Sequence, residues 1–397
     1  MKLACVIHRF GADIAGGSEG HCRLVAQHLA DSHAVTIVTT TAKDHITWRN
    51  HYPPGESHDG ALRVLRFPVA RERSMQRFMD LSDRVFADGA SAADEQQWFR
   101  ENGPESPELI EYLRRHAADF DRVLFWAYRY YDAYFGLPLA GDRAVLVPTA
   151  EEDPLIHVDA VRDLFARPRG FMFLTPEEAA LVGARAPAGR PSAIIGCGLD
   201  PVSSTGPHVE LGALGVRDPF VLYLGRVDPN KGCGAMLRHF EKYAAPGRNV
   251  QLVVAGPASM PIPDHPLIRP LGFVGDQVRE ALFAGARALV MPSPFESLSM
   301  VLLEAWNRAL PALVNARCKV LRGQVERANG GLYYGNAVEF AAALDYLIDH
   351  PAESHQLGRQ GLAYVEREYR WPTVMRKIEA LLASVGPALA AAGEQRT

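Results

Sequence analysis

Four charged side chains in the C-terminal half of the chain have the types and spacing of a ligand site. Arg226 and Lys231 stand five residues apart in LYLGRVDPNKG, and Glu296 and Glu304 stand eight apart in MPSPFESLSMVLLEAW. Each segment follows an apolar, strand-like run and leads into a helical pattern. Guanidinium and ammonium groups suit phosphate oxygens, and carboxylates accept hydrogen bonds from hydroxyls. Together these residues predict a site for a molecule that carries both a diphosphate and a sugar.

Short apolar runs alternate with helical patterns along nearly the whole chain. This alternation is typical of βα units whose parallel sheets are covered on both faces. The strand candidates are 3–8, 34–40, 62–67, 122–127, 144–149, 171–176 and 192–197 in the first half, and 220–225, 250–256, 269–274, 288–293, 311–316 and 331–334 in the second. Ligands of open α/β sheets bind outside the carboxyl ends of the strands, where Arg226 and Glu296 are expected.

A segment rich in Gly, Pro and Ser, residues 197–219, separates the two halves and lacks periodicity. We therefore expect an N-terminal Rossmann-like domain over 1–200 and a C-terminal one over 201–372. The helical pattern near the C-terminus breaks at Trp371. We expect the helix after about residue 372 to pack back on the N-terminal domain.

Composition excludes several classes of protein. The chain has 397 residues, is 48% hydrophobic and 22% charged, and carries a net charge of −4, which indicates a globular protein without bulk attraction to nucleic acid. No apolar run approaches the roughly 20 residues that span a bilayer, and the N-terminus lacks the features of a signal peptide, so we expect a cytoplasmic protein. Five scattered cysteines without a C-x-x-C pair argue against disulfides and zinc.

Five arginines fall within fifteen residues and leave two interpretations open. They are Arg63, Arg66, Arg71, Arg73 and Arg77, with Phe67 and Phe78 among them. One interpretation is a solvated helix face and loop. The other is a surface for an anionic acceptor or a membrane, which would make the protein peripheral at the inner face of the membrane with a lipid-linked acceptor.

A glycine-rich loop follows the first expected strand, in HRFGADIAGGSEGHC (8–22). Gly16 and Gly17 permit close backbone approach, and amides at the start of the next helix, with Ser18 as its cap, would face an anion. Neither the dinucleotide fingerprint, whose first glycine would be Ala15, nor a P-loop is present. A plain tight turn and a ligand contact both remain open.

The segment around Glu296 predicts a loop that opens a helix. Backbone amides of Ser297, Leu298 and Ser299 would be free to bind a diphosphate. Glu296 would accept hydrogen bonds from hexose hydroxyls, and Glu304 would hold ribose hydroxyls. Glu304 can also be read as an ordinary exposed helix residue, although its apolar neighbours favour partial burial, which requires a partner.

Weaker candidates lie in the first half. Asp119 and Asp121 form a D-x-D pattern beside a strand, where a turn is the simpler reading. Glu151 and Glu152, with Asp153, place acids at a strand end, either as a solvated loop or as active-site acids. His157 is a lone histidine beyond them. The aromatic run 125–135 is typical of core, with a sugar-stacking platform as the alternative.

With these motifs in register, the chain resembles the family 4 retaining glycosyltransferases, which have the two-domain GT-B fold. The resemblance rests on the N-terminal glycine loop, I-x-G-x-G-L-D (194–200), G-R-x-x-x-x-K-G (225–232), E-x7-E (296–304) and NGGLYY (329–334). It implies two Rossmann-like domains facing across a cleft. It also implies transfer of a hexosyl group, with retention, from a nucleoside diphosphate sugar to an unknown hydroxyl acceptor in glycan, glycolipid or glycoside biosynthesis.

The resemblance also implies roles for individual residues. Arg226 and Lys231 would bind the donor diphosphate, Glu296 the donor sugar and Glu304 the ribose. Gly16 and Gly17 would lie on the phosphate or acceptor side of the cleft. The base-binding loop would match Phe273, Val274 and Gly275. Such enzymes are metal-independent and need no cofactor. Leaving-group oxygen helps to deprotonate the acceptor on the same face of the sugar, so no protein nucleophile is needed.

The sequence departs from the family pattern at three places. Glu296-Ser297-Leu298-Ser299 replaces E-G-F-G, so a position that needs positive φ would be strained by about 1–2 kcal/mol. NRALP (307–311) replaces the frequent S-G-x-P. Glu151 and Glu152 stand where a T-A-H histidine is common. Two alternatives therefore remain, namely a sugar-nucleotide epimerase of the same fold that uses these acids or Asp153, and a non-catalytic sugar-nucleotide-binding subunit.

Overall fold

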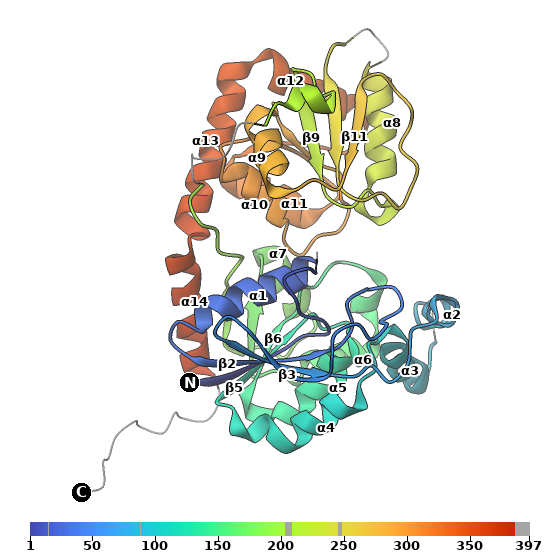
Figure 1. The fold of residues 1–397 in the computed structure, drawn as a ribbon, viewed down its shortest axis with the longest axis vertical. Helices are drawn as coiled ribbons and strands as arrows, with labels where there is room; N and C mark the ends of the chain where they lie inside the picture. Colours follow the sequence, from blue (N-terminus) through green and yellow to red (C-terminus); the bar gives the residue numbers. More distant parts are fainter. Residues whose placement is uncertain (15, 88, 203–208, 245–247, 386–397) are drawn as a thin grey trace, which may run out of the picture. The chain divides into compact units, whose positions relative to one another are not determined.

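The computed structural model describes residues 1–14, 16–87, 89–202, 209–244 and 248–385. The chain divides into two compact units, one formed by Met1–Cys197 with Val374–Thr397 and the other by Gly198–Thr373. Each unit is a mostly parallel sheet with helices around it (Figure 1). The predicted α/β class with two Rossmann-like domains is therefore confirmed. The sequence predicts domain boundaries near residues 200 and 372, and the chain divides into its compact units after residues 197 and 373.

The sheet of the first unit has the order β3-β4-β2-β1-β5-β6-β7-β8. Its strands are β1 Lys2–Val6, β2 Ala34–Thr40, β3 Gly55–Asp59, β4 Leu62–Phe67, β5 Arg122–Trp126, β6 Ala144–Val147, β7 Gly170–Phe173 and β8 Ser192–Ile194. Neighbouring strands are parallel, except that β3 is antiparallel to β4. The sequence pattern missed β3 because this exposed edge strand, GESHD, has no apolar residues.

Helices cover both faces of this sheet. They are α1 Gly17–Leu29, α2 Met75–Val85, α3 Ala92–Asn102, α4 Pro107–His116, α5 Tyr131–Ala140, α6 Asp159–Phe165, α7 Pro176–Gly183 and most of α14 Trp371–Ser384. Ala4 and Val6 share one core cluster with residues of α2 to α6, as expected from the alternation of side chains along a strand. α14 is held by the Arg122 Nε–H, which donates to the Leu382 carbonyl at 3.0 Å.

The sheet of the second unit has the order β11-β10-β9-β12-β13-β14, and all neighbouring strands are parallel. Its strands are β9 Phe220–Leu224, β10 Gln251–Ala255, β11 Ile268–Gly272, β12 Leu289–Met291, β13 Ala312–Asn315 and β14 Gly331–Tyr334. Its helices are α8 Cys233–Ala244, α9 Asp276–Gly285, α10 Met300–Trp306, α11 Lys319–Ala328, α12 Ala337–Asp349 and α13 Pro351–Glu368. Complete burial of β9, β10 and β12 explains their continuous apolar sequences.

The predicted junction is built around one glycine. A Cβ on Gly198 would lie 2.2 Å from the Trp371 ring, so only glycine fits there. The Leu199 N–H donates to the Tyr369 carbonyl at 2.7 Å, where α13 has ended and α14 is about to begin. Within the predicted linker, residues 203–208 lie outside the described part. Among described helices, none is long and apolar enough to cross a membrane.

Candidate active site

The order of the second sheet reverses at one point. From β9 the chain continues to β10 on one side, whereas β12 lies on the other side and pairs with β9 through Leu289 and Leu222. Such a switch point leaves a crevice at the carboxyl ends of the two strands, where ligands of open α/β sheets bind. The loops that follow β9 and β12 carry the residues singled out from the sequence.

Lys231 and Glu296 meet at this switch point. Lys231 ends a short 3₁₀ turn, η5 Pro229–Lys231, that follows β9, and Glu296 lies in the loop between β12 and α10. The Lys231 Nζ lies 2.8 Å from Glu296 Oε1, and the two side chains are 32% and 12% exposed. A cation suited to phosphate and a carboxylate suited to hydroxyls are therefore adjacent and accessible, although they are distant in sequence.

Gly232 allows the two loops to come together. It has φ +72°, and a Cβ would lie 2.2 Å from the carbonyl oxygen of Pro292. Any side chain here would push η5 away from the loop after β12. The K-G pair of the motif therefore combines a ligand group with the close backbone approach that positions it.

Arg226 lies on the same edge of the sheet with an exposed side chain. Its carbonyl accepts a hydrogen bond from the Tyr223 hydroxyl at 2.5 Å. Burial, together with the neighbouring Cys233, raises the pKa of Tyr223 far above its usual value, so the hydroxyl keeps its proton. This contact fixes the turn that carries the guanidinium.

The predicted strain in Glu296-Ser297-Leu298-Ser299 is wrong. Within this fully described segment no residue has positive φ, so no position requires glycine. Leu298 is buried, and Ser299 is the N-cap of α10, its Oγ accepting from the Leu302 N–H at 3.2 Å. The strained position lies instead in NRALP, where Ala309 has φ +53° at the place of the frequent glycine.

Glu304 is partly buried and ion-paired, so the interpretation as an ordinary exposed helix residue is wrong. Its carboxylate pairs with Arg279 of α9, and the Glu304 side chain is 15% exposed. The Arg279 guanidinium lies over the Phe283 ring at 5.6 Å. Arg279 was not identified from the sequence, because its proximity to Glu304 depends on how α9 and α10 pack.

The loop after β11 presents an aromatic side chain. Phe273 is 81% exposed and follows Gly272, which has φ +66°. Val274 comes next, and Gly275 is the N-cap of α9. The predicted strand 269–274 therefore ends early, which leaves Phe273 free to stack on a planar group.

The first sheet has its own switch point, between β1 and β5, and buried charges occupy it. His8 and Arg9 follow β1, and both contact the carboxylate of Glu19 on α1, His8 Nε2 at 3.0 Å and Arg9 Nε at 2.5 Å. A Cβ on Gly16 would lie 2.2 Å from Glu19 Oε2, so this glycine makes room for the carboxylate. Gly17 is the exposed first residue of α1.

Ser18 is not the helix cap that the sequence suggested. The N-cap of α1 is Gly16, and the Ser18 hydroxyl donates to Glu19 Oε2 at 2.9 Å instead. Burial opposes the charge of Glu19, but the charges and hydrogen bonds of His8 and Arg9 hold its pKa well below the usual range. Burial also lowers the pKa of His8, although Glu19 opposes this shift. The cluster is a buried ionic anchor.

His21 is a second buried group that the sequence did not reveal. Its Nε2 lies 2.8 Å from the Gly196 carbonyl, and the Trp126 Nε1–H donates to its Nδ1 at 3.0 Å. These partners fit a neutral ring whose proton is on Nε2. Burial lowers the pKa of His21 to about 4. The contact ties α1 to the strand end that leads into the junction.

The acidic segment after β6 is held by a buried glutamate. Glu178 accepts from the Ala150 N–H at 2.7 Å and from the Leu174 N–H at 2.6 Å. Asp153 pairs with Arg129, whereas Glu152 is exposed and Glu151 is half-buried. His157 is also exposed, with its Nδ1 2.7 Å from Arg185 Nη2.

In the D-x-D pattern, Asp121 accepts from the Lys2 N–H at 2.7 Å and Asp119 contacts His116 at 2.8 Å, as in an ordinary turn. Among described residues, no group of three His, Cys, Asp or Glu side chains is arranged to hold a metal ion. All five cysteines are buried and none forms a disulfide, as predicted.

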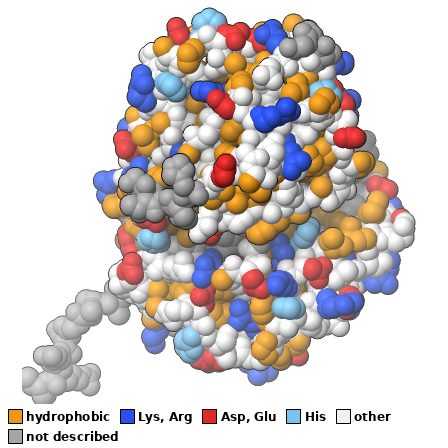
Figure 2. All heavy atoms as spheres, turned by 45° about the horizontal axis from the view of Figure 1, so that its top comes forward, with side chains coloured by type: hydrophobic (Ala, Val, Ile, Leu, Met, Phe, Trp, Pro, Cys, Tyr) orange, Lys and Arg blue, Asp and Glu red, His pale blue; other side chains and the backbone are white. Residues whose placement is uncertain are grey.

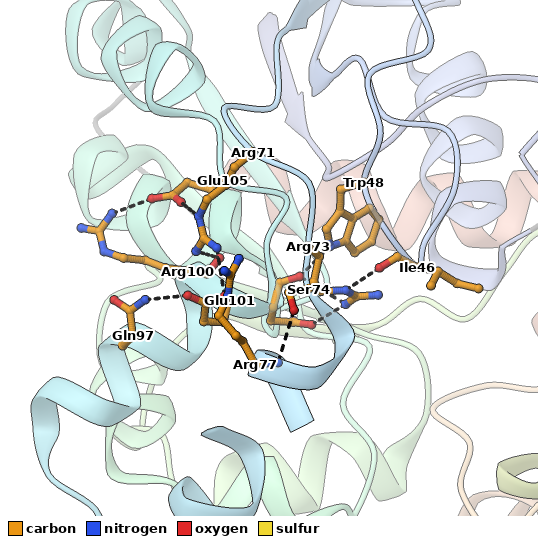
Figure 3. A network of polar contacts seen from close by, with 11 residues as sticks. Ile46, Trp48, Arg71, Arg73, Ser74, Arg77, Gln97, Arg100, Glu101 and Glu105 are labelled. Carbon is orange, nitrogen blue, oxygen red and sulfur yellow. Dashed lines mark hydrogen bonds and ion pairs between the residues drawn. The ribbon is translucent and has the colours of Figure 1, made fainter. Parts of the chain in front are cut away.

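The arginine-rich segment has extensive structural contacts. Figure 3 shows Arg71, Arg73 and Arg77 joined to carboxylates and carbonyls of neighbouring segments. The contacts are Arg63 with Glu56, Arg66 with Ser57 and the Phe10 carbonyl, Arg71 with Glu101 and Glu105, Arg73 with the Ile46 and Asn102 carbonyls, and Arg77 with Glu101. These partners favour the structural interpretation. Acidic and basic side chains are also interspersed over the face drawn in Figure 2.

Comparisons with known proteins agree with this architecture. Residues 218–350 match the family model described as glycosyl transferases group 1. No curated protein matches the sequence. Similar solved structures include sucrose-phosphate synthase from Thermosynechococcus elongatus (TM-score 0.70, 16% identity, covering 96% of this chain and 98% of that one).

Two further structures are HepE from Anabaena in complex with UDP and glucose (TM-score 0.68, 15% identity, 97% and 100% covered) and α,α-trehalose 6-phosphate synthase from Burkholderia multivorans (TM-score 0.62, 13% identity, 96% and 98% covered). At such identities the likeness establishes the fold. The chain therefore has the GT-B fold, and residues 218–350 within its second unit match the group 1 glycosyltransferase model.

Proposed function

We propose that this protein is a retaining, metal-independent glycosyltransferase that moves a hexosyl group from a nucleoside diphosphate sugar to an acceptor hydroxyl. The observation that carries the proposal is the Lys231–Glu296 pair at the switch point of the second sheet, 2.8 Å apart and partly exposed. It lies within the region that matches the group 1 glycosyltransferase model. Structures of the similar Anabaena protein contain UDP and UDP-glucose, which supports a nucleotide-sugar donor here.

The residues have complementary parts in this reaction. Lys231 and Arg226 bind the diphosphate, which gains negative charge as the bond to the sugar breaks, so fixed cations lower the barrier more than they strengthen ground-state binding. Glu296 orients the sugar through its hydroxyls, and Glu304 holds the ribose. Phe273 stacks on the base, with Val274 and Gly275 beside it. Backbone amides of Ser297 and Leu298 add contacts to the diphosphate.

The acceptor hydroxyl attacks the anomeric carbon on the face that the diphosphate leaves. Attack from this face gives the new bond the configuration of the old one, and the acceptor proton passes to the leaving phosphate oxygen as the bond between sugar and phosphate breaks. This route uses neither a protein nucleophile nor a bound metal. Water has to be excluded during transfer, because otherwise the donor would be hydrolysed.

A donor screen tests the proposal. The purified protein is mixed with nucleoside diphosphate sugars, with and without magnesium, while thermal shift reports binding and nucleotide release reports turnover. We expect a selective shift and release that are indifferent to magnesium and are lost in Glu296→Ala and Lys231→Ala. Absence of any shift would reject the donor site. Product formed without an acceptor by inversion at a ring carbon would identify an epimerase instead.

A further inference from the structure

The segment NRALP (307–311), which replaces the frequent S-G-x-P, contains a buried side chain that the proposed donor site does not use. Asn307 is the C-cap of α10, the helix that carries Glu304, and it is 7% exposed. Its Nδ2–H donates to the Asp200 carbonyl at 2.8 Å, and its Oδ1 accepts from the Arg370 guanidinium at 2.8 Å. A single side chain therefore joins the end of α10 to two segments that are distant in sequence.

These two segments are the places where the chain passes between its units. It enters the second unit at residues 198–200 and leaves it at 369–373, and we call these segments the two crossings. The crossings also pair with each other. The Leu199 N–H donates to the Tyr369 carbonyl at 2.7 Å, and the Arg370 guanidinium donates to the Leu199 carbonyl at 3.4 Å. The end of α10 is therefore bonded to both crossings at once.

The two contacts require an amide at position 307. The Asp200 carbonyl only accepts hydrogen bonds, and the Arg370 guanidinium only donates them. The Asn307 amide supplies one donor and one acceptor for these partners. A carboxylate would place a second acceptor against the carbonyl, and an apolar side chain would make neither bond. Asparagine, but not aspartate, therefore fits this position.

Close packing leaves α10 little freedom to move independently of α13. A Cβ on Gly358 would lie 1.8 Å from the Ala309 carbonyl oxygen, and one on Gly361 would lie 2.4 Å from the Trp306 ring. The Trp306 Nε1–H also donates to the Gly330 carbonyl at 2.7 Å. α13 leads directly into the second crossing. A displacement of α10 would therefore reach the crossing, because interiors packed this closely transmit strain.

We propose that Asn307 couples the donor site to the two crossings, so that a nucleotide sugar held by Glu296 and Glu304 restrains the crossings. This inference rests on the proposed glycosyltransferase function. Glu304 lies only three residues before Asn307 on the same helix, or about 5 Å along its axis. A coupling free energy is reciprocal, so a substitution at a crossing has to change the affinity for the donor. Asn307 is a positioning residue in this scheme and does not contact the donor.

Hydrogen exchange on the full chain tests the coupling in the first direction. The ligand is whichever of UDP-glucose, ADP-glucose and GDP-mannose gives the largest thermal shift, and it is used at saturation. In the wild type we expect it to slow exchange at least threefold in peptides that cover 198–200 and 369–373. In Asn307→Ala this protection should be lost, whereas protection of 295–304 should remain. Asn307→Asp, which keeps only the contact with Arg370, should show an intermediate effect.

Calorimetry with the same nucleotide sugar tests the reverse direction. Arg370→Met removes the contact from the side of the crossing and should weaken donor binding at least threefold, as should Asn307→Ala. Asn336→Ala is the matched control, because it removes an asparagine that caps α12 in the same unit by accepting from the Val338 and Glu339 N–H groups. Loss of this cap lowers stability. The control should bind the donor as the wild type does.

The failure of the coupling can be distinguished from the failure of the proposed function. Protection of 295–304 with unchanged exchange at both crossings would overturn the coupling and leave the proposed function standing. Donor affinity in Asn307→Ala and Arg370→Met equal to that of the wild type would do the same. Absence of any thermal shift would reject the proposed function. The ligand-free proteins would then test the coupling, because Asn307→Ala should exchange faster than the wild type in 300–306 and at both crossings, and equal exchange would reject it.

Discussion

The two sheets both place charged side chains at a switch point, but burial differs between them. At the first switch point, Glu19 is 5% exposed and contacts both His8 and Arg9. At the second, Lys231 is 32% exposed and lies 2.8 Å from Glu296, which is 12% exposed. The first cluster is enclosed and serves to hold β1 and α1 together. The second is accessible, and its Lys231–Glu296 ion pair can give way to contacts with a ligand. A place at the switch point of a sheet is therefore not enough to make a cluster of charges a binding site.

The largest expected effect is a loss of stability when the buried cluster of Glu19, His8 and Arg9 is disrupted. Glu19→Ala would leave Arg9 buried without its carboxylate, and removing one partner of a buried pair costs about 3–5 kcal/mol. Urea unfolding measures this loss. Arg23 lies on α1 like Glu19 and pairs with Asp59 of β3, which is 29% exposed, so Asp59→Ala should cost less than about 1 kcal/mol. Equal losses in the two variants would contradict the assignment of Glu19 as an anchor.

Substitutions in the second cluster should lower turnover and leave stability nearly unchanged. Glu296→Gln and Lys231→Met should lower nucleotide release by about 10²- to 10³-fold, as for other groups that stabilise charge in the transition state. Their free energy of unfolding should change by less than about 1 kcal/mol, because the pair is partly exposed. A large loss of stability with normal turnover per folded molecule would show that this cluster is structural as well.

The pH dependence of stability tests whether His21 is buried as a neutral ring. Its folded pKa is about 4, against about 6.5 in an unfolded chain. Between these values the unfolded state takes up a proton that the folded state does not, so stability present above pH 6.5 falls as pH drops to 4, by about 3 kcal/mol. Denaturant midpoints from pH 7 to 4 should decline less steeply in His21→Gln. An identical decline would contradict burial of the neutral ring.

Substitution of Glu304 tests its proposed contact with the donor ribose. If it holds the donor ribose, Glu304→Gln should raise the donor KM by about 10- to 100-fold, the range for hydrogen bonds to a charged group, with a smaller effect on kcat. Arg279→Gln serves as the comparison, because it removes the ion-pair partner and keeps the carboxylate. A donor KM that is unchanged in Glu304→Gln would assign Glu304 a purely structural role with Arg279.

The smallest effect concerns Ala309, which adopts a left-handed conformation with φ +53°. Ala309→Gly should stabilise the protein by up to about 1 kcal/mol, since relief of the strain exceeds the added entropy of the unfolded chain. Ala342, an exposed residue within α12, is the control, because glycine there should destabilise by about 1 kcal/mol. Destabilisation by both substitutions would contradict the strain at Ala309.

The sequence predicted the elements and residues that follow buried strands. The meeting of Lys231 and Glu296 was predictable because each follows an apolar run, and parallel strands bring their carboxyl ends to one edge. Gly198 and Gly232 belong to motifs noted in the sequence, but the need for glycine at each position depends on contacts with Trp371 and Pro292 that the sequence did not predict.

Other features depend on contacts between segments that are distant in sequence, and no local sequence pattern predicts them. The pairing of Arg279 with Glu304, and of Arg71 with Glu101 and Glu105, requires the packing of separate helices and loops. The polar edge strand β3 is stabilised by backbone pairing with β4 and leaves no apolar pattern. The Asp13–Lys43 pair similarly joins two loops that follow different strands.

Hydrogen exchange with mass spectrometry tests the central claim most directly. The full chain is compared with and without the nucleotide sugar that gives the largest thermal shift. We expect slower exchange in peptides that cover 225–233 and 295–304, and this protection should be absent in Lys231→Met. Exchange unchanged in these peptides, or protection confined to residues 8–19, would contradict the donor site at the second switch point.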